Sequence, residues 1–106
     1  MPKYLLQVSY TAEGAKGVMK DGGSKRRAAA AALAESLGGK LECFYFAFGS
    51  TDVFTIFDAP DNVTAAAVSM NVAASGAVNS KITVLLTQEE IDSATKKQGS
   101  YTAPGR

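Results

Sequence analysis

The chain contains no histidine and a single cysteine, so an enzyme of this sequence would have to work with carboxylates, tyrosine, cysteine, lysine or a bound cofactor. The lack of histidine excludes a histidine-based catalytic triad, a histidine general base and the usual zinc ligand sets. A single cysteine also excludes a disulfide within the chain. Proton transfer would then depend on phenols or carboxylates, and the catalytic candidates are Tyr10, Tyr45 and Asp52. We expect neither a bound metal nor a cofactor.

The stretch KDGGSKRRAAAAA, residues 20–32, places three consecutive cations where a helix is predicted to begin. Glycines and the free amides of a helix start can form a concavity that binds an anion. The alternative is a plain elbow between two helices, with cations that are solvated or paired with Asp21 and Glu13. Adjacent helical residues point roughly 100° apart, so the cations cannot all converge, and we favour the elbow. The candidates for the anion site are Lys20, Gly22, Gly23, Ser24, Arg26 and Arg27.

A second group of polar side chains shares one face of the predicted strands. Such a group can line a pocket that orients an otherwise apolar ligand. For the Cys43 thiol, a buried structural role is the simpler interpretation, because a mid-strand position offers neither the neighbouring cation nor the helix terminus that activates a catalytic cysteine. The group comprises Gln7, Ser9, Cys43, Tyr45, Thr55 and Thr83. We expect Asp52 to bond the backbone amides of its own turn, and Asp58 and Asp61 to serve the start of a helix.

Propensity and capping signals place these residues on four strands and four helices. Strands are predicted at 3–10, 40–48, 51–58 and 79–87. Thr11 caps a helical segment, Ser24 starts a second helix from about Lys25 to Leu37, and a third runs from the Asp58–Asp61 stretch to near Gly76. A capping box at Thr87 begins the fourth. We expect one domain over residues 1–94 and a flexible C-terminal tail over 95–106.

The order strand–helix–strand–strand–helix–strand predicts an α+β, ferredoxin-like βαββαβ fold, with a four-stranded antiparallel sheet and the helices on one face. The opposite face is too apolar for water, which predicts a homodimer or higher homo-oligomer that stacks sheet on sheet. We assign to the helix side Tyr4, Leu6, Val8, Phe44, Phe46, Phe54, Ile56, Ile82 and Val84. We assign to the open side Leu5, Gln7, Ser9, Leu41, Cys43, Tyr45, Val53, Thr55, Phe57, Thr83 and Leu85.

Composition limits the partners. The 106 residues have a net charge of +1, a hydrophobic share of 46% and a charged share of 20%, as in an ordinary soluble domain. Nothing in this balance indicates nucleic acid or an anionic membrane as a partner. No stretch approaches the roughly 20 apolar residues of a membrane span, and the first residues lack an apolar signal core. We therefore expect a cytoplasmic protein.

Four blocks, YT.EG.KG..K.GG..R, LGG.LE.FYFAFG, D.PDN..A.A and SGAV..K.TVLLT.EE.D, resemble the GYD domain family. These are small bacterial proteins grouped with the ferredoxin-like dimeric α/β barrels, and the resemblance runs from about Pro2 to Asp92. The Gly-x-Tyr-Asp motif of the family corresponds here to Gly49, Ser50, Thr51 and Asp52. The tyrosine is missing, which puts any role for a phenol at position 51 in doubt.

The resemblance implies little about activity, because related dimeric α/β barrels include cofactorless monooxygenases, lactone isomerases and plain binding proteins. Our leading hypothesis is a homo-oligomeric domain without its own catalysis, which binds a small molecule or serves as an accessory or assembly subunit. The alternative is a cofactorless monooxygenase or isomerase acting on a small apolar or aromatic metabolite. It predicts a closed cavity between sheet and helices that contains a titratable group. A second alternative is an anion or phosphate sensor at Gly22–Arg27.

Overall fold

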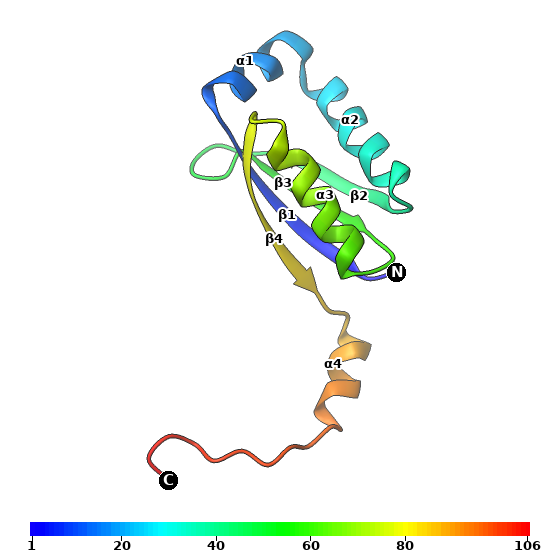
Figure 1. Cartoon of the computed structure of the whole chain (residues 1–106), viewed down its shortest axis with the longest axis vertical. Coiled ribbons are helices and arrows are strands. Elements are labelled where there is room, and N and C mark those ends of the chain that lie inside the picture. The colour runs from blue at the N-terminus through cyan, green and yellow to red at the C-terminus, as the bar shows by residue number, and fades with distance from the viewer.

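The computed structural model describes all residues, 1–106, and shows an antiparallel sheet covered on one face by helices (Figure 1). The strand order is β2-β3-β1-β4, and every neighbouring pair is antiparallel. Helix α2 lies over β2 and α3 over β4. This arrangement confirms the predicted α+β, ferredoxin-like fold. The elements are β1 (Lys3–Tyr10), α1 (Ala12–Asp21), α2 (Gly23–Ser36), β2 (Lys40–Phe46), β3 (Val53–Asp58), α3 (Asn62–Ala74), β4 (Val78–Leu85) and α4 (Gln88–Thr95).

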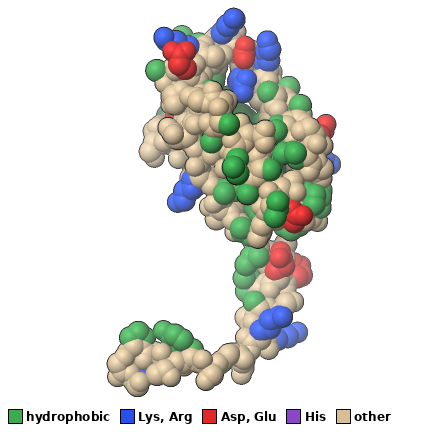
Figure 2. Space-filling view, viewed as in Figure 1, with side chains coloured by type: hydrophobic (Ala, Val, Ile, Leu, Met, Phe, Trp, Pro, Cys, Tyr) green, Lys and Arg blue, Asp and Glu red, His purple; other side chains and the backbone are tan.

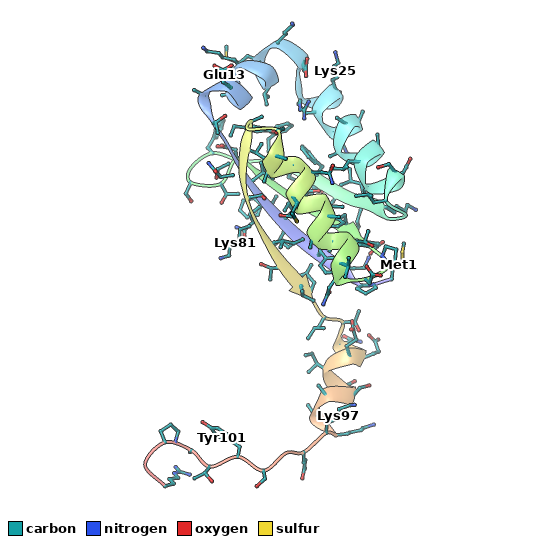
Figure 3. All side chains as sticks on the ribbon, viewed as in Figure 1. Met1, Glu13, Lys25, Lys81, Lys97 and Tyr101 are labelled. Carbon is teal, nitrogen blue, oxygen red and sulfur yellow. The ribbon has the colours of Figure 1, made fainter.

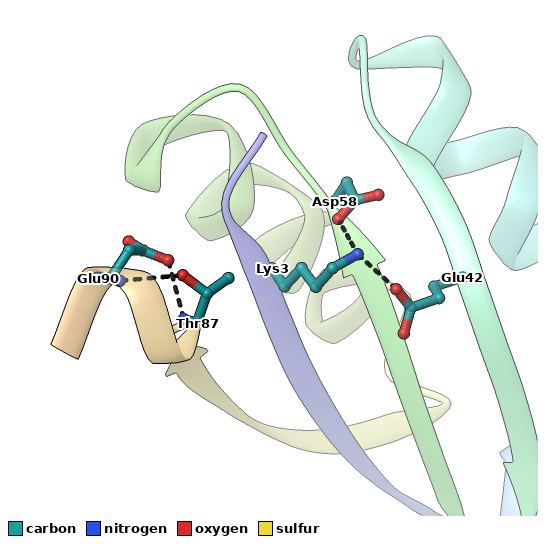
Figure 4. A network of polar contacts seen from close by, with 5 residues as sticks. All are labelled: Lys3, Glu42, Asp58, Thr87 and Glu90. Atoms are coloured by element: carbon teal, nitrogen blue, oxygen red, sulfur yellow. Dashed lines mark hydrogen bonds and ion pairs between the residues drawn. The ribbon is translucent and has the colours of Figure 1, made fainter. Parts of the chain in front are cut away.

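Three helices begin at the capping residues that the sequence indicates. Each cap accepts a hydrogen bond from the backbone N–H three residues further on, which satisfies a donor that the helix itself leaves free. The distances are 3.2 Å for Thr11, 2.8 Å for Asp61 and 3.2 Å for Thr87. At Thr87 the Glu90 side chain also accepts from the cap N–H, which completes the predicted capping box (Figure 4).

The elbow between α1 and α2 is a single residue, Gly22. Its φ of +81° belongs to the left-handed region that favours glycine. Its N–H donates to the Val18 carbonyl at 2.7 Å, and its own carbonyl accepts from Arg26 N–H at 3.3 Å. The residue therefore ends one helix and begins the next. The prediction that Ser24 starts α2 is wrong, because the helix already begins at Gly23.

The core lies between the sheet and the helices. Tyr4, Leu6 and Val8 of β1 are buried there, and the rings of Tyr4 and Phe57 stack with their centroids 5.6 Å apart. The predicted face assignment of β3 is wrong. Its residues beneath the helices are Val53, Thr55 and Phe57, whereas Phe54 and Ile56 lie on the open face.

Strand β2 contains an irregularity that changes which side chains face the helices. The pairing with β3 shifts register between Leu41 and Cys43. As a result Leu41, which the alternation places on the open side, and Phe44 both pack against the core. At the same end of the sheet, Lys3 forms ion pairs with Glu42 and, at 2.9 Å, with Asp58 (Figure 4).

Helix α4 and the residues after it extend away from the sheet (Figure 1). The molecule consequently measures 56 × 33 × 22 Å along its principal axes, with a radius of gyration of 16.9 Å. None of the four helices is both long enough and apolar enough to cross a membrane.

Candidate ligand-binding cleft

A cleft lies between α2, α3 and the sheet. One part of it, which we call the inner cavity, is half-open, has a volume of about 120 Å³ and is lined by twelve residues of which ten are hydrophobic. The sheet supplies the floor, α2 supplies alanines and a leucine, and α3 supplies a valine. These lining residues include Leu6, Val8, Phe44, Val53, Ala29, Ala30, Leu33 and Val72. Ala29 and Ala30 are small, so this part of α2 leaves space above the strands.

The cleft has a wider, more polar mouth of about 360 Å³. It is bordered by α1, the first turns of α2, the end of α3 and the start of β4. Glu13, Asn71 and Ser75 contribute polar groups to it. Five residues line both parts, so we describe the two as one cleft with an apolar interior: Tyr10, Arg26, Leu33, Val72 and Val78.

Of the three consecutive cations, only Arg26 lines the cleft. Its side chain is 40% exposed, and its Nη1 lies 3.5 Å from Asp21 Oδ2. Lys25 Nζ lies 3.7 Å from the other oxygen of the same carboxylate, and Arg27 is exposed and forms no ion pair. Figure 3 shows Glu13 and Lys25 at this end of the molecule, on α1 and α2 respectively. Lys25 and Arg26 thus meet at the Asp21 carboxylate, and Arg27 stands apart from them.

The other candidates for an anion site lie outside the cleft. Lys20, Gly22, Gly23 and Ser24 are exposed at the elbow, and none of them lines either cavity. Gly23 lies against the Phe46 ring, where an added Cβ would come within 3.0 Å of Cε2. The elbow therefore has a packing role, and Arg26 alone connects it to the cleft.

Tyr10 ends β1 at the junction of the two cavities. Burial raises the pKa of its phenol above the ordinary 10, while the nearby Arg26 guanidinium opposes this and Asp52 adds to it. At neutral pH the phenol is therefore protonated and can donate a hydrogen bond. The backbone N–H of Tyr10 donates to Asp52 Oδ2 at 2.8 Å. The expectation that Asp52 bonds its own turn is thus wrong: its carboxylate ties the β2–β3 connection to β1.

The six polar residues predicted to share a strand face do not all do so. Gln7, Ser9, Cys43, Tyr45 and Thr83 lie on the open face, and Tyr45 is 68% exposed. Thr55 lies beneath the helices, where its Oγ1 donates to the Cys43 carbonyl at 2.7 Å. Thr55 lines the inner cavity, whereas the other five line neither part of the cleft. Tyr10 and Tyr45 are therefore on opposite faces of the sheet.

Only the enzyme alternative predicted a cavity between the sheet and the helices that contains a titratable group, and among its candidate residues Tyr10 lines the cleft. The alanine run of α2 by itself indicates only a close approach of the helix to the sheet. No group of three or more His, Cys, Asp or Glu side chains is placed to hold a metal ion.

The family model for the GYD domain matches residues 4–95. The chain belongs to the GYD domain family. The match runs from the second residue of β1 to the last residue of α4, so the whole cleft lies inside the GYD domain. No curated protein and no solved structure matches the chain. The mouth residues Tyr10, Glu13, Gly14, Gly17 and Arg26 all fall in the block YT.EG.KG..K.GG..R.

Proposed function

We propose that this GYD domain is a homodimeric small-molecule-binding protein without its own catalysis, and that its ligand occupies the cleft between α2, α3 and the sheet. The observation that carries this proposal is the combination of an apolar interior with a few polar groups at the mouth. Ligand sites in proteins typically have this composition, with apolar walls for affinity and sparse polar groups for orientation.

The polar groups at the mouth favour binding over catalysis. A general base needs a pKa near the working pH and free access to the substrate proton. The Tyr10 phenol is protonated at neutral pH, because burial raises its pKa. The Asp52 carboxylate already accepts the Tyr10 N–H, and Glu13 is 82% exposed and lies 3.8 Å from Lys16 Nζ. None of these groups is positioned as a base above the apolar interior.

The open face of the sheet supports a dimer. Tyr45 and Phe54, which lie opposite each other on β2 and β3, are 68% and 39% exposed. Leu5 and Ile56 continue this apolar surface across the central strands. Adjacent exposed apolar side chains on a sheet usually mark a surface that another sheet covers. We therefore propose that two copies stack by this face, which leaves both clefts accessible on the outside.

Native mass spectrometry of the full-length protein purified from its own host tests both parts. We expect a dimer mass plus a bound small molecule. Val72→Phe fills the cleft and should remove the bound molecule, whereas Val63→Phe on the exposed side of the same helix should retain it. Far-UV circular dichroism checks that both variants fold. A parent without bound ligand, or equal retention by the two variants, would refute the ligand site.

The dimer has a separate readout in the same experiment. Tyr45→Ser combined with Phe54→Ser removes the two exposed rings of the open face and should convert the dimer to monomer without releasing the ligand. A parent that is monomeric at micromolar concentration would overturn the stacking proposal and leave the cleft proposal standing.

One observation favours a second candidate function, a cofactorless enzyme for a small apolar or aromatic metabolite. The Tyr10 phenol is a titratable group between the sheet and the helices, beside a cation. In that case Tyr10→Phe should abolish turnover of the recovered ligand while ligand binding persists. A phosphate sensor at Gly22–Arg27 has no comparable support, because Lys25 and Arg26 are both paired with Asp21 and Arg27 stands apart from them.

A further inference from the structure

We infer that the ligand of the cleft is a small monoanion with a compact apolar body, a monocarboxylate foremost, whose anionic end pairs with Arg26. This inference rests on the proposed binding function and names its ligand class. The apolar body would occupy the inner cavity, and the carboxylate would lie at the junction with the mouth, where Arg26 and Tyr10 line both parts.

The inner cavity sets the size and polarity of the body. Its volume is about 120 Å³, and an apolar cavity of about 150 Å³ in another protein is large enough for benzene. A single ring or a short branched chain is therefore about the largest body that the inner cavity can hold. The only polar side chain on the cavity wall besides Tyr10 and Arg26 is Thr55, and its hydroxyl proton is already donated to the Cys43 carbonyl. A body that carried its own polar groups would find no donor there.

Arg26 is the only charged side chain that lines the inner cavity. Its single carboxylate partner is Asp21, at 3.5 Å, and this carboxylate also lies 3.7 Å from Lys25 Nζ. Both contacts are longer than the 2.7–2.9 Å that is typical of a strong charge-assisted hydrogen bond. The contact with Asp21 therefore does not fix the orientation of the guanidinium. A guanidinium has five N–H donors in a planar fork, so Arg26 retains donors for a second, bidentate carboxylate.

The surroundings favour one negative charge and disfavour two. Between Thr11 and Arg27 the chain carries five cations and two carboxylates, and Figure 2 shows Lys and Arg side chains gathered at this end. This excess attracts anions to the mouth. The two carboxylates, Glu13 and Asp21, lie at the mouth and beside Arg26 respectively, so a second charge on the ligand would meet like charge. The protonated Tyr10 phenol offers the remaining hydrogen bond to the anion.

A pair of nearly isosteric probes, benzoate and benzamide, tests the inference on the full-length protein by nuclear magnetic resonance titration. We expect benzoate to shift the resonances of Ala30, Leu33 and Val72 and to bind about tenfold more tightly than benzamide, a difference of about 1.4 kcal/mol. Arg26→Gln should remove this preference by weakening benzoate about tenfold and leaving benzamide unchanged. Arg27→Gln removes an equal charge one residue away, outside the cleft, and should leave the preference intact.

The outcomes separate this inference from the proposed function. If both probes shift the cleft resonances with equal affinity, the cleft binds small molecules and the anion inference is overturned. The inference is likewise overturned if Arg26→Gln and Arg27→Gln weaken benzoate equally, since the effect then reflects overall charge. If neither probe shifts the cleft resonances, the assigned ligand class is wrong. A molecule retained in the parent and lost in Val72→Phe would still support binding in the cleft.

Discussion

Gly14 occupies a position on α1 where only a hydrogen fits. A Cβ added there would lie 1.9 Å from the Ala77 carbonyl oxygen and 3.0 Å from Cδ1 of Tyr10. The same carbonyl already accepts the Thr11 N–H at 2.9 Å and the Thr11 hydroxyl at 3.1 Å. This contact fixes the start of α1 against the start of β4, at the mouth of the cleft. Gly14→Ala should therefore disturb both stability and the mouth.

The size of the effect follows from these distances. To bring the new contact from 1.9 Å to an acceptable 3.0 Å, α1 must move by about 1.1 Å relative to Ala77. Overpacking costs about 1–3 kcal/mol, and each of the two bonds to the carbonyl that weakens costs about 0.5–1.5 kcal/mol. The better helix propensity of alanine returns about 1 kcal/mol. We expect a net loss of about 3 kcal/mol, or roughly 12–24 °C in Tm for a domain of this size.

Gly17→Ala is the matched control, because it makes the same substitution one turn later in α1. Its added Cβ would meet nothing within 4 Å. Alanine should therefore raise the free energy of unfolding by about 0.5–1 kcal/mol. Urea denaturation followed by circular dichroism measures both variants. A Gly14→Ala variant as stable as the parent, or a shift of the same sign in both variants, would refute the argument.

Three further predictions concern polar contacts. Asp52→Ala removes the acceptor of the Tyr10 N–H and should lower the free energy of unfolding by about 1–2 kcal/mol in urea; an unchanged midpoint would contradict it. Hydrogen bonds from Lys3 to the Glu42 and Asp58 carboxylates raise the pKa of Lys3 above 10.5. The stability that these ion pairs contribute is therefore complete below pH 10.5 and is lost as the pH rises through the raised pKa. The alkaline loss of stability should accordingly be smaller in Lys3→Met, and identical pH profiles would exclude the effect. The hydrogen bond from the Thr64 backbone N–H lowers the pKa of Asp61 below 3.8. The stability that this helix cap contributes is therefore present above pH 3.8 and is lost as the pH falls through the lowered pKa. Asp61→Ala should destabilise the protein at neutral pH and flatten its acid profile, and a melting series from pH 2 to 7 tests this.

The helices and strands could be predicted because their signals are local. Thr11, Asp61 and Thr87 cap the helices that follow them, and Gly38 and Gly76 adopt positive φ where α2 and α3 end. The predicted cap at Ser24 was the exception, because Gly22, at positive φ, is both the C-cap of α1 and the N-cap of α2.

The faces of β3 could not be predicted from hydrophobicity. Both parities of this strand are apolar, with Phe54 and Ile56 on one and Val53 and Phe57 on the other. The polar Thr55 favoured the open face, but its hydroxyl donates to the Cys43 carbonyl and can therefore lie inside the core. In β2 the register shift after Leu41 broke the alternation on which any assignment depends. Which face of β2 and β3 lies beneath the helices is set by the register in which these strands pair with their neighbours.

The lining and the volume of the cleft could not be predicted from the sequence, for a related reason. Its lining combines β1, α2, β2, β3, α3 and β4, and its volume depends on how far apart α2 and α3 lie above the sheet. Local patterns carry no information on that separation. Helical geometry did predict that the three cations at the elbow cannot all converge, but it did not show that Lys25 and Arg26 share Asp21 or that Arg26 lines the cleft.

The projecting α4 has a consequence for how this molecule behaves in solution. A compact chain of this length has a radius of gyration of about 13 Å, whereas this one has 16.9 Å. A single copy will therefore migrate through a gel-filtration column ahead of a globular standard of equal mass. Elution volume alone would make a monomer look like a dimer. Light scattering or native mass spectrometry, which report mass independently of shape, are the measurements on which the sheet-stacking proposal should be judged.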